Sequence, residues 1–383
     1  MLLANFDTGT FLRETWQKRP LLMRNPWDAW RNPLEPDELA GLACEPEVES
    51  RLVLRASDRW QLEHGPLSAG RFEKLAAQRW TLLVQAVDHH VPAVAELLTP
   101  FRFIPNWRVD DVMVSYAVDE GGVGAHFDNY DVFLVQGLGQ RRWQIGARCD
   151  QSTPLLPHDD LRLLAHFEPT DEWILDPGDI LYVPPGYAHN GIAVGGDCMT
   201  YSIGFRAPSR SELIAGWAEH LASELDDDDR FSDADLALQA NPGEISAHAL
   251  ARLQEMVTER MASGDDFACW FGEYATAPKN QEIDWRPEQP LQLDELRSFV
   301  SAGIPLMRNP ASRFAFVRRG EGALMLFVDG RSHDCSGPVA VFAEGLCAAD
   351  SMVVGPDLLD SAEGASLLLR LLGEGSVAFK PDD

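Results

Sequence analysis

The stretch GGVGAHFDNYDVFLVQGLGQRRWQIG (121–146) decides how this chain is interpreted. A glycine-rich turn is followed by a His-x-Asp pair, His126 and Asp128, and then by residues typical of strands. Alternate residues of a β-strand share one face, so a pair on a strand directs an imidazole and a carboxylate to the same side. We therefore expect the two side chains to bind one metal ion together.

The His-x-acid spacing alone is weak evidence. A chain with 10 histidines and 60 acidic residues is expected to contain such pairs by chance, and this chain has three. His158 follows Pro157 in a polar segment, and His166 lies shortly before Pro169, so we interpret both pairs as surface loops. Only His126 lies between two strand patterns.

The stretch DPGDILYVPPGYAHNG (176–191) supplies a third candidate ligand. An apolar strand pattern ends at a Pro-Pro-Gly turn, and His189 follows three residues after the glycine. Such a turn reverses the chain and directs His189 back toward His126 and Asp128. Two histidines and one carboxylate on one side of a metal leave positions open, as Fe(II) oxygenases require for a co-substrate and O₂. The sequence therefore predicts an iron site.

A basic residue is expected beside an iron site of this kind. If the co-substrate is 2-oxoglutarate, its keto acid end chelates the metal and its distal carboxylate needs a cation. The guanidinium of Arg141 offers a planar fork that matches a carboxylate. Ser115, on the strand before the metal pair, is a second candidate contact. Two other classes stay open from these residues alone: a zinc hydrolase, which would not need Arg141, and a non-catalytic cupin-like binding protein.

The predicted fold is α+β. Residues 1–207 carry most of the strand signals, and short strands separated by turns are typical of a jelly-roll or cupin-like double-stranded β-helix. The first hundred residues are predicted to be more helical, with helices over 36–43 and 80–98. The strands are predicted over 113–119, 130–137, 141–146, 179–185 and 198–205.

Residues 208–277 are predicted to be a helical region. Ser209 and Glu212 form a capping box that opens a helix to about Leu225. Two further helices are predicted over 246–263 and 266–276, and the first places a row of apolar side chains on one face. Its apolar faces can be buried against the first domain or against a second copy of the chain, and we expect the second, which makes this region a dimerisation element. The row consists of Leu250, Leu253, Val257 and Met261.

Residues 278–383 are predicted to form a small winged-helix-like domain. The pattern indicates a helix over 293–302, a hairpin formed by 314–318 and 323–328, a helix near 361–371 and a short final strand. Basic residues are dispersed in this domain, so the sequence does not support nucleic-acid binding by it.

The bulk composition limits the partners and the compartment. The chain has 32 basic and 60 acidic residues, a net charge of -28, which repels nucleic acid and anionic membranes and attracts a basic partner. The six cysteines include no Cys-x-x-Cys pair, which suits a reducing cytosol. No signal peptide or membrane-spanning run is evident, so we expect a cytoplasmic protein.

Several motifs of the chain resemble those of a known family. HFDNYDVFLVQGLGQRRWQIG, PGDILYVPPGYAHNG and YSIGFRAP resemble the JmjC-type ribosomal oxygenases, in particular the bacterial ribosomal protein arginine hydroxylases. FLRETWQKRPLL (11–22) also matches a segment that this family carries before its catalytic core. The resemblance is close over the catalytic region, extends over the helical region and is weak over the last hundred residues.

The resemblance implies a function and a set of roles. The family's iron ligands correspond to His126, Asp128 and His189, and its 2-oxoglutarate contacts to Arg141 and Ser115. It implies hydroxylation, at the β-carbon, of an arginine in a large-subunit ribosomal protein by a homodimeric enzyme that uses Fe(II), 2-oxoglutarate and O₂. Related ribosomal oxygenases modify histidine instead, and the same chemistry on another protein or a small molecule stays open. Asp119 and Glu120 are candidates to bind the substrate guanidinium.

Overall fold

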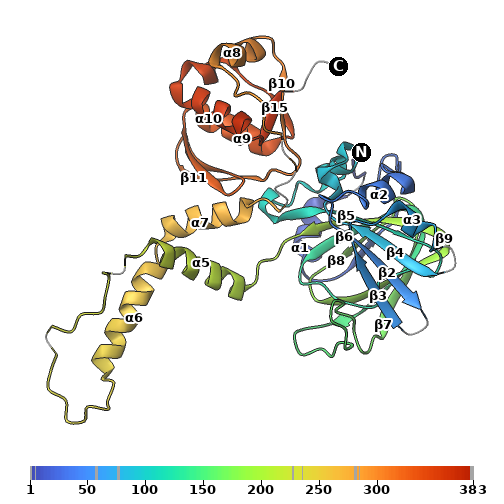
Figure 1. The fold of residues 1–383 in the computed structure, drawn as a ribbon, viewed down its shortest axis with the longest axis horizontal. Coiled ribbons are helices and arrows are strands. Elements are labelled where there is room, and N and C mark those ends of the chain that lie inside the picture. The colour runs from blue at the N-terminus through green and yellow to red at the C-terminus, as the bar shows by residue number, and fades with distance from the viewer. Residues whose placement is uncertain are drawn as a thin grey trace. The chain divides into compact units, whose positions relative to one another are not determined.

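The structure is a computed structural model that describes residues 2–4, 6–56, 59–75, 78–226, 228–234, 236–279, 283 and 285–379. The chain divides into two compact units (Figure 1). Unit 1 consists of Met1–Ala207, Lys279–Trp285 and Asn309–Ala311, and unit 2 contains Pro208–Pro278, Arg286–Arg308 and Ser312–Asp383.

Unit 1 is built around one curved sheet, the double-stranded β-helix that the sequence predicts (Figure 1). Its strand order is β1-β8-β6-β9-β5-β4-β2-β3, and β7 pairs with β6. The strands are β1 (Leu21–Met23), β2 (Ser50–Ala56), β3 (Arg59–His64), β4 (Arg79–Val84), β5 (Val109–Ala117), β6 (Asp131–Arg148), β7 (Pro169–Leu175), β8 (Ile180–Val183) and β9 (Tyr187–Phe205).

The long antiparallel pair of β6 and β9 forms the centre of this sheet. The start of β6 is buried on both faces, because Val132 and Leu134 join one apolar cluster while Phe133 and Val135 join another. A strand covered on both sides needs a continuous apolar run, and DVFLV provides it. The predicted strands 130–137 and 141–146 are therefore parts of a single strand.

The helices of unit 1 are short, and one prediction about them is wrong. The predicted helix over 36–43 is confirmed as α2 (Pro36–Leu42). The segment 80–98, however, begins as β4 and continues as separate short turns, because WTLLV is buried on successive residues beside β2 and β5. The remaining helices are α1 (Thr8–Glu14), α3 (Ala69–Phe72), η1 (Val87–His89), α4 (Pro92–Ala95), η2 (Glu96–Phe101) and η3 (Asn106–Arg108).

Unit 2 opens with three helices: α5 (Arg210–Glu224), α6 (Ala247–Met261) and α7 (Gly264–Thr276). The capping box of α5 is confirmed, since Ser209 and Glu212 bond each other's backbone. The apolar row of α6 lies exposed: Leu250 is 54% and Val257 60% accessible. By contrast, α7 packs closely on a strand of its own unit, because a methyl group on Gly272 would lie 2.3 Å from the Phe327 ring.

The rest of unit 2 confirms the predicted winged-helix domain. Strands β11, β12 and β13 form one three-stranded sheet, and β14, β10 and β15 form another. One apolar cluster joins these strands to the helices α8, α9 and α10. The elements are α8 (Leu293–Ser301), β10 (Pro305–Arg308), β11 (Phe314–Gly320), β12 (Ala323–Val328), β13 (Arg331–Ser336), α9 (Pro338–Ala348), β14 (Ser351–Val353), η4 (Pro356–Asp360), α10 (Ala362–Gly373) and β15 (Val377–Phe379).

Three domains were predicted, whereas the contacts define two units, with α5 to α7 grouped with the winged helix. The boundaries 1–207, 208–277 and 278–383 stay a prediction. Among the described residues, no helix combines the length and the apolar character that crossing a membrane requires.

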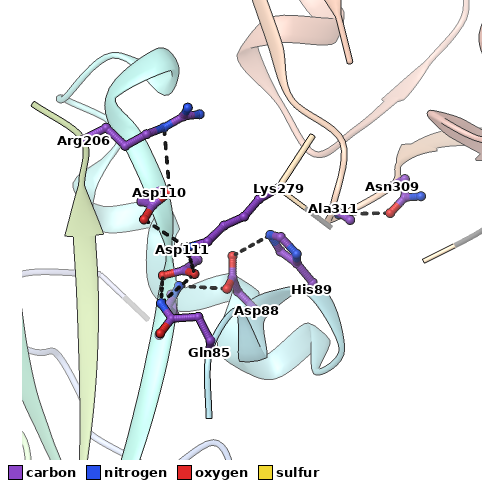
Figure 2. Close-up of polar contacts among 10 residues, drawn as sticks. Gln85, Asp88, His89, Asp110, Asp111, Arg206, Lys279, Asn309 and Ala311 are labelled. Atoms are coloured by element: carbon purple, nitrogen blue, oxygen red, sulfur yellow. Dashed lines mark hydrogen bonds and ion pairs between the residues drawn. The ribbon is translucent and has the colours of Figure 1, made fainter. Parts of the chain in front are cut away.

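A buried polar network in unit 1 links the segment at Lys279 to the sheet (Figure 2). The Lys279 Nζ lies 2.6 Å from an oxygen of buried Asp111, which also accepts from Gln85. Asp88 accepts from the backbone N–H of Val112 at 2.8 Å. Burial and the nearby Asp111 carboxylate raise the pKa of Asp88 to about 7.

A second buried network lies immediately after the candidate metal residues. The carboxylate of Asp131, which is fully buried, pairs with Arg108 at 2.9 Å and accepts from Tyr182 at 2.6 Å and from Gln17 at 2.9 Å. These bonds join the start of β6 to β8 and to the segment that follows α1. Both oxygens of this carboxylate therefore accept hydrogen bonds within the fold.

Replacement of Asp131 by alanine is expected to destabilise unit 1 by about 3–5 kcal/mol, because it leaves the half-buried Arg108 charge without its partner. Urea denaturation followed by tryptophan fluorescence measures the change. Asp28→Ala, at an exposed position, serves as the control and should change stability by less than about 0.5 kcal/mol. Equal stability of the two variants would contradict this role of Asp131.

Candidate metal centre and its buried arginine

The loop between β5 and β6 lies along β9, and this pairing brings the candidate ligands together. The backbone N–H of His126 donates to the carbonyl of His189 at 3.0 Å, and His189 returns the bond at 2.8 Å. At a second point of this pairing, the N–H of Glu120 donates to the carbonyl of Ala193 at 3.0 Å, and the N–H of Ala193 donates to the carbonyl of Gly121 at 2.9 Å. The prediction that His126 and Asp128 lie on a strand is wrong: they lie in a loop, in which His126 forms an isolated antiparallel bridge with His189.

Glycine residues allow the loop to come this close. A methyl group on Gly122 would lie 2.4 Å from the carbonyl oxygen of Gly191 on β9, a distance that excludes any side chain there. The glycine-rich turn of the sequence is thus required by the close approach of two backbones, as glycine is at many such positions.

Three ligand atoms converge at this point. Those of His126, Asp128 and His189 all lie within 4.8 Å of one another. An Asp128 Oδ2 atom lies 3.8 Å from Nε2 of His126 and 3.5 Å from Nε2 of His189. No other group of three such ligands occurs in the part of the chain that the structure describes.

Both imidazoles are held with Nε2 available to a metal. The Nδ1 atoms bond to backbone carbonyls two residues earlier, His126 to Gly124 at 2.9 Å and His189 to Tyr187 at 3.0 Å. A carbonyl can only accept, so each Nδ1 carries the proton and each Nε2 lone pair is free. Burial and the neighbouring His126 lower the pKa of His189 to about 4, which keeps it neutral at pH 7.

Arg141 lies on β6, on the sheet face that carries His189. In the register of β6 and β9, Ile145 is opposite His189 and Arg141 is opposite Ala193. Residues 141 and 145 share a face, about 13 Å apart along the strand. The ring of Trp143 lies between them, 5.9 Å from the His189 ring and 5.8 Å from the guanidinium carbon of Arg141.

The guanidinium of Arg141 is buried without a carboxylate partner among the described residues. Arg141 is only 4% exposed, and its Nη1 donates to the hydroxyl of Ser115 at 3.1 Å. The Ser115 hydroxyl in turn donates to the carbonyl of Thr200 at 3.4 Å. Within the described residues, buried Nη2 has no hydrogen-bond partner. An anion is the ligand that such a cation requires.

The other candidates of the sequence lie elsewhere. His158 accepts from the N–H of Asp160 in a loop, and His166 is exposed, as expected of surface residues. Glu120 pairs with Arg79, while Asp119 accepts from the N–H of Gly195 at 2.8 Å. Asp119 therefore holds a bend of β9.

Sequence reasoning missed one residue of the site. The thiol of Cys198 accepts a hydrogen bond from Nε of Arg141 at 3.3 Å, and the residue is fully buried. It points inward because β9 is irregular at Gly195 and Gly196, which have left-handed φ values of +74° and +151°. Adjacent glycines inside a strand pattern are a signal of such a bulge.

The fold and the His–Asp–His cluster define a JmjC-class double-stranded β-helix. Residues 96–213 match the JmjC domain family, and residues 259–378 match the family described as ROXA-like winged helix.

Similar proteins narrow this class. The ribosomal protein uL16 3-hydroxylase of Escherichia coli is 41% identical over 298 residues, 78% of this chain and 79% of that protein. A probable ribosomal oxygenase of Haemophilus influenzae is 39% identical over 302 residues, 76% and 73% of the two chains. The structure of YcfD, a ribosomal oxygenase from Escherichia coli in complex with cobalt and 2-oxoglutarate, matches with a TM-score of 0.88 at 34% identity over the whole of both chains. The chain belongs to the JmjC ribosomal oxygenase family.

Removal of a candidate ligand should abolish tight metal binding. We expect His189→Ala and Asp128→Ala to weaken binding of Co(II) by more than about 100-fold, since loss of outer contacts alone weakens metal sites 10–100-fold. Calorimetric titration of the metal-free protein measures this. His158→Ala removes the histidine of the second His-x-Asp pair and should leave binding unchanged; a loss there instead would refute the ligand assignment.

Proposed function

We propose that this protein is an Fe(II)- and 2-oxoglutarate-dependent oxygenase that hydroxylates the β-carbon of an arginine in a large-subunit ribosomal protein. The observation that carries the proposal is the pairing of a three-ligand metal cluster with a buried, anion-seeking guanidinium on the same sheet face. The name of the Escherichia coli relative, ribosomal protein uL16 3-hydroxylase, supports the substrate class and the carbon.

The residues have separate roles in this proposal. His126, Asp128 and His189 hold Fe(II), and their arrangement on one side of the ion leaves positions for the co-substrate. Arg141, supported by Ser115, binds the distal carboxylate of 2-oxoglutarate. When bound, Fe(II) couples the decarboxylation of 2-oxoglutarate by O₂ to hydroxylation, giving succinate, CO₂ and the hydroxylated side chain. The structure of a relative with cobalt and 2-oxoglutarate supports this choice of ligands.

The charge of the protein suits a basic client. Ribosomal proteins are rich in lysine and arginine, and a net charge of -28 attracts them and raises their encounter rate. The same charge disfavours direct binding to nucleic acid. Asp119 and Glu120 remain the candidates to bind the substrate guanidinium, although both have contacts within the protein.

We place the enzyme in the cytoplasm, where its ribosomal client is made. The six cysteines, which all lie in the described part of the chain, form no disulfides, and this suits a reducing compartment.

The test uses a ribosomal protein mixture as substrate. Incubation with Fe(II), 2-oxoglutarate and the protein should produce succinate and add one oxygen atom to an arginine of a large-subunit protein, as mass spectrometry detects. Arg141→Ala should raise the KM for 2-oxoglutarate by about 10–100-fold, because a charge-assisted bidentate contact is lost.

Arg142→Ala, at the neighbouring position on β6, is the matched control and should keep a KM close to that of the wild type. Succinate production without a modified ribosomal protein would keep the chemistry and reject the substrate. Absence of succinate with every substrate would reject the oxygenase.

We further propose that the protein is a homodimer formed through α6. Side chains of Leu250, Leu253 and Val257 lie exposed on one face of this helix, and such a row is seldom left in water. A second copy of the helix can cover it.

A charge in the centre of this row should separate the subunits. Val257→Asp is expected to give a monomer at micromolar concentration in light scattering coupled to size-exclusion chromatography. Arg252→Asp places the same side chain on the opposite face of α6 and should keep the dimer. A wild-type protein that is itself monomeric would refute the proposal.

A further inference from the structure

We infer that Cys198 is a positioning residue for the co-substrate: its thiol holds Nε of Arg141, so that the guanidinium offers the edge formed by Nη1 and Nη2 to the carboxylate. This inference rests on the proposed function, because it concerns the 2-oxoglutarate site. It adds Cys198 to that site, a residue that is neither a metal ligand nor one of the predicted co-substrate contacts.

The inference starts from the five N–H groups of the guanidinium. A carboxylate can bind the side-on edge, formed by Nε and Nη2, or the end-on edge, formed by Nη1 and Nη2. The Nε–H group is directed to Cys198 Sγ at 3.3 Å, and one Nη1–H to Ser115 Oγ at 3.1 Å. Among the described residues Nη2 has no hydrogen-bond partner, so its two N–H groups and the second N–H of Nη1 are left for an anion, and the end-on edge is the one that Cys198 does not occupy.

Three strands fix this arrangement. Arg141 comes from β6, Ser115 from β5 and Cys198 from β9, where Cys198 is paired with Ala117 of β5. The thiol is fully buried and packs with two small side chains, Ala117 and Ala193. Ala193 is also the residue opposite Arg141, so small side chains lie beside both the thiol and the arginine, while the Trp143 ring lies 5.8 Å from the guanidinium carbon.

The chemistry of the thiol suits this role. A neutral thiol is a weak acceptor, so it orients the cation without neutralising it. An aspartate at 198 would form an ion pair with Arg141 and compete with the co-substrate. Alanine would leave the Nε–H group free and allow the carboxylate to bind at either edge, which is a less well-defined position relative to the metal.

The test compares three replacements of one side chain. Cys198→Ala removes the acceptor, Cys198→Val removes it while filling the space, and Cys198→Ser replaces it with a hydroxyl acceptor. Calorimetric titration of the cobalt-loaded protein with 2-oxoglutarate measures binding without turnover. We expect Kd to rise about three- to tenfold in the alanine and valine variants, the effect of one hydrogen bond, and to stay within about twofold in the serine variant.

Cys44→Ala is the matched control, since Cys44 is a cysteine of the same unit whose thiol bonds only a helix carbonyl, that of Ala40. It should bind 2-oxoglutarate as the wild type does. Steady-state kinetics supply a second readout: KM for 2-oxoglutarate should rise with Kd, while kcat stays within about twofold.

Two outcomes would overturn the inference while leaving the proposed function intact: unchanged Kd in both the alanine and the valine variants, or a serine variant as weak as the alanine variant. If the wild-type protein itself does not bind 2-oxoglutarate, the proposed function fails and this inference fails with it.

Discussion

The functional centre depends on one backbone pairing, the two hydrogen bonds between His126 and His189. They join a loop that follows β5 to strand β9, on which His189 lies 61 residues after Asp128. Each histidine then directs Nδ1 to a carbonyl two residues before it, so the orientation of both rings follows from local backbone geometry. Once the pairing is made, the ligand atoms are close together before any metal binds, and the entropy lost on binding is reduced.

The buried arginine is the second constraint, and it explains the character of its neighbours. A buried charge without a counter-ion is unfavourable, and most proteins supply a carboxylate. Arg141 instead has a hydroxyl and a thiol, which are neutral. Neutral acceptors fix the direction of the guanidinium without neutralising its charge, which suits the anion-binding role that we propose for it.

Much of this could be predicted from the sequence, where the signal is local. The Pro-Pro-Gly turn before His189, the capping box at Ser209 and the hairpin at 314–328 depend on neighbouring residues, and all three are found. The prediction of a helix over 80–98 is wrong because the apolar spacing there fits the period of a helix as well as that of a strand. Only the pairing of its first residues with β2 and β5 decides in favour of a strand. Tertiary context outweighed local preference there.

The inward position of Cys198 shows a different limit. Which residues of a strand face inward follows from alternation, until a bulge shifts the register. Gly195 and Gly196 create such a shift between Ala193 and Cys198, and Gly139 on the facing strand approaches so closely that a methyl group there would lie 2.0 Å from the carbonyl of Asp197. Regular alternation counted from Ala193 would place the side chain of residue 198 on the opposite face of the sheet. Its contact with Arg141 therefore results from the register shifts where β6 and β9 are paired. The residue type alone gives no indication of this contact.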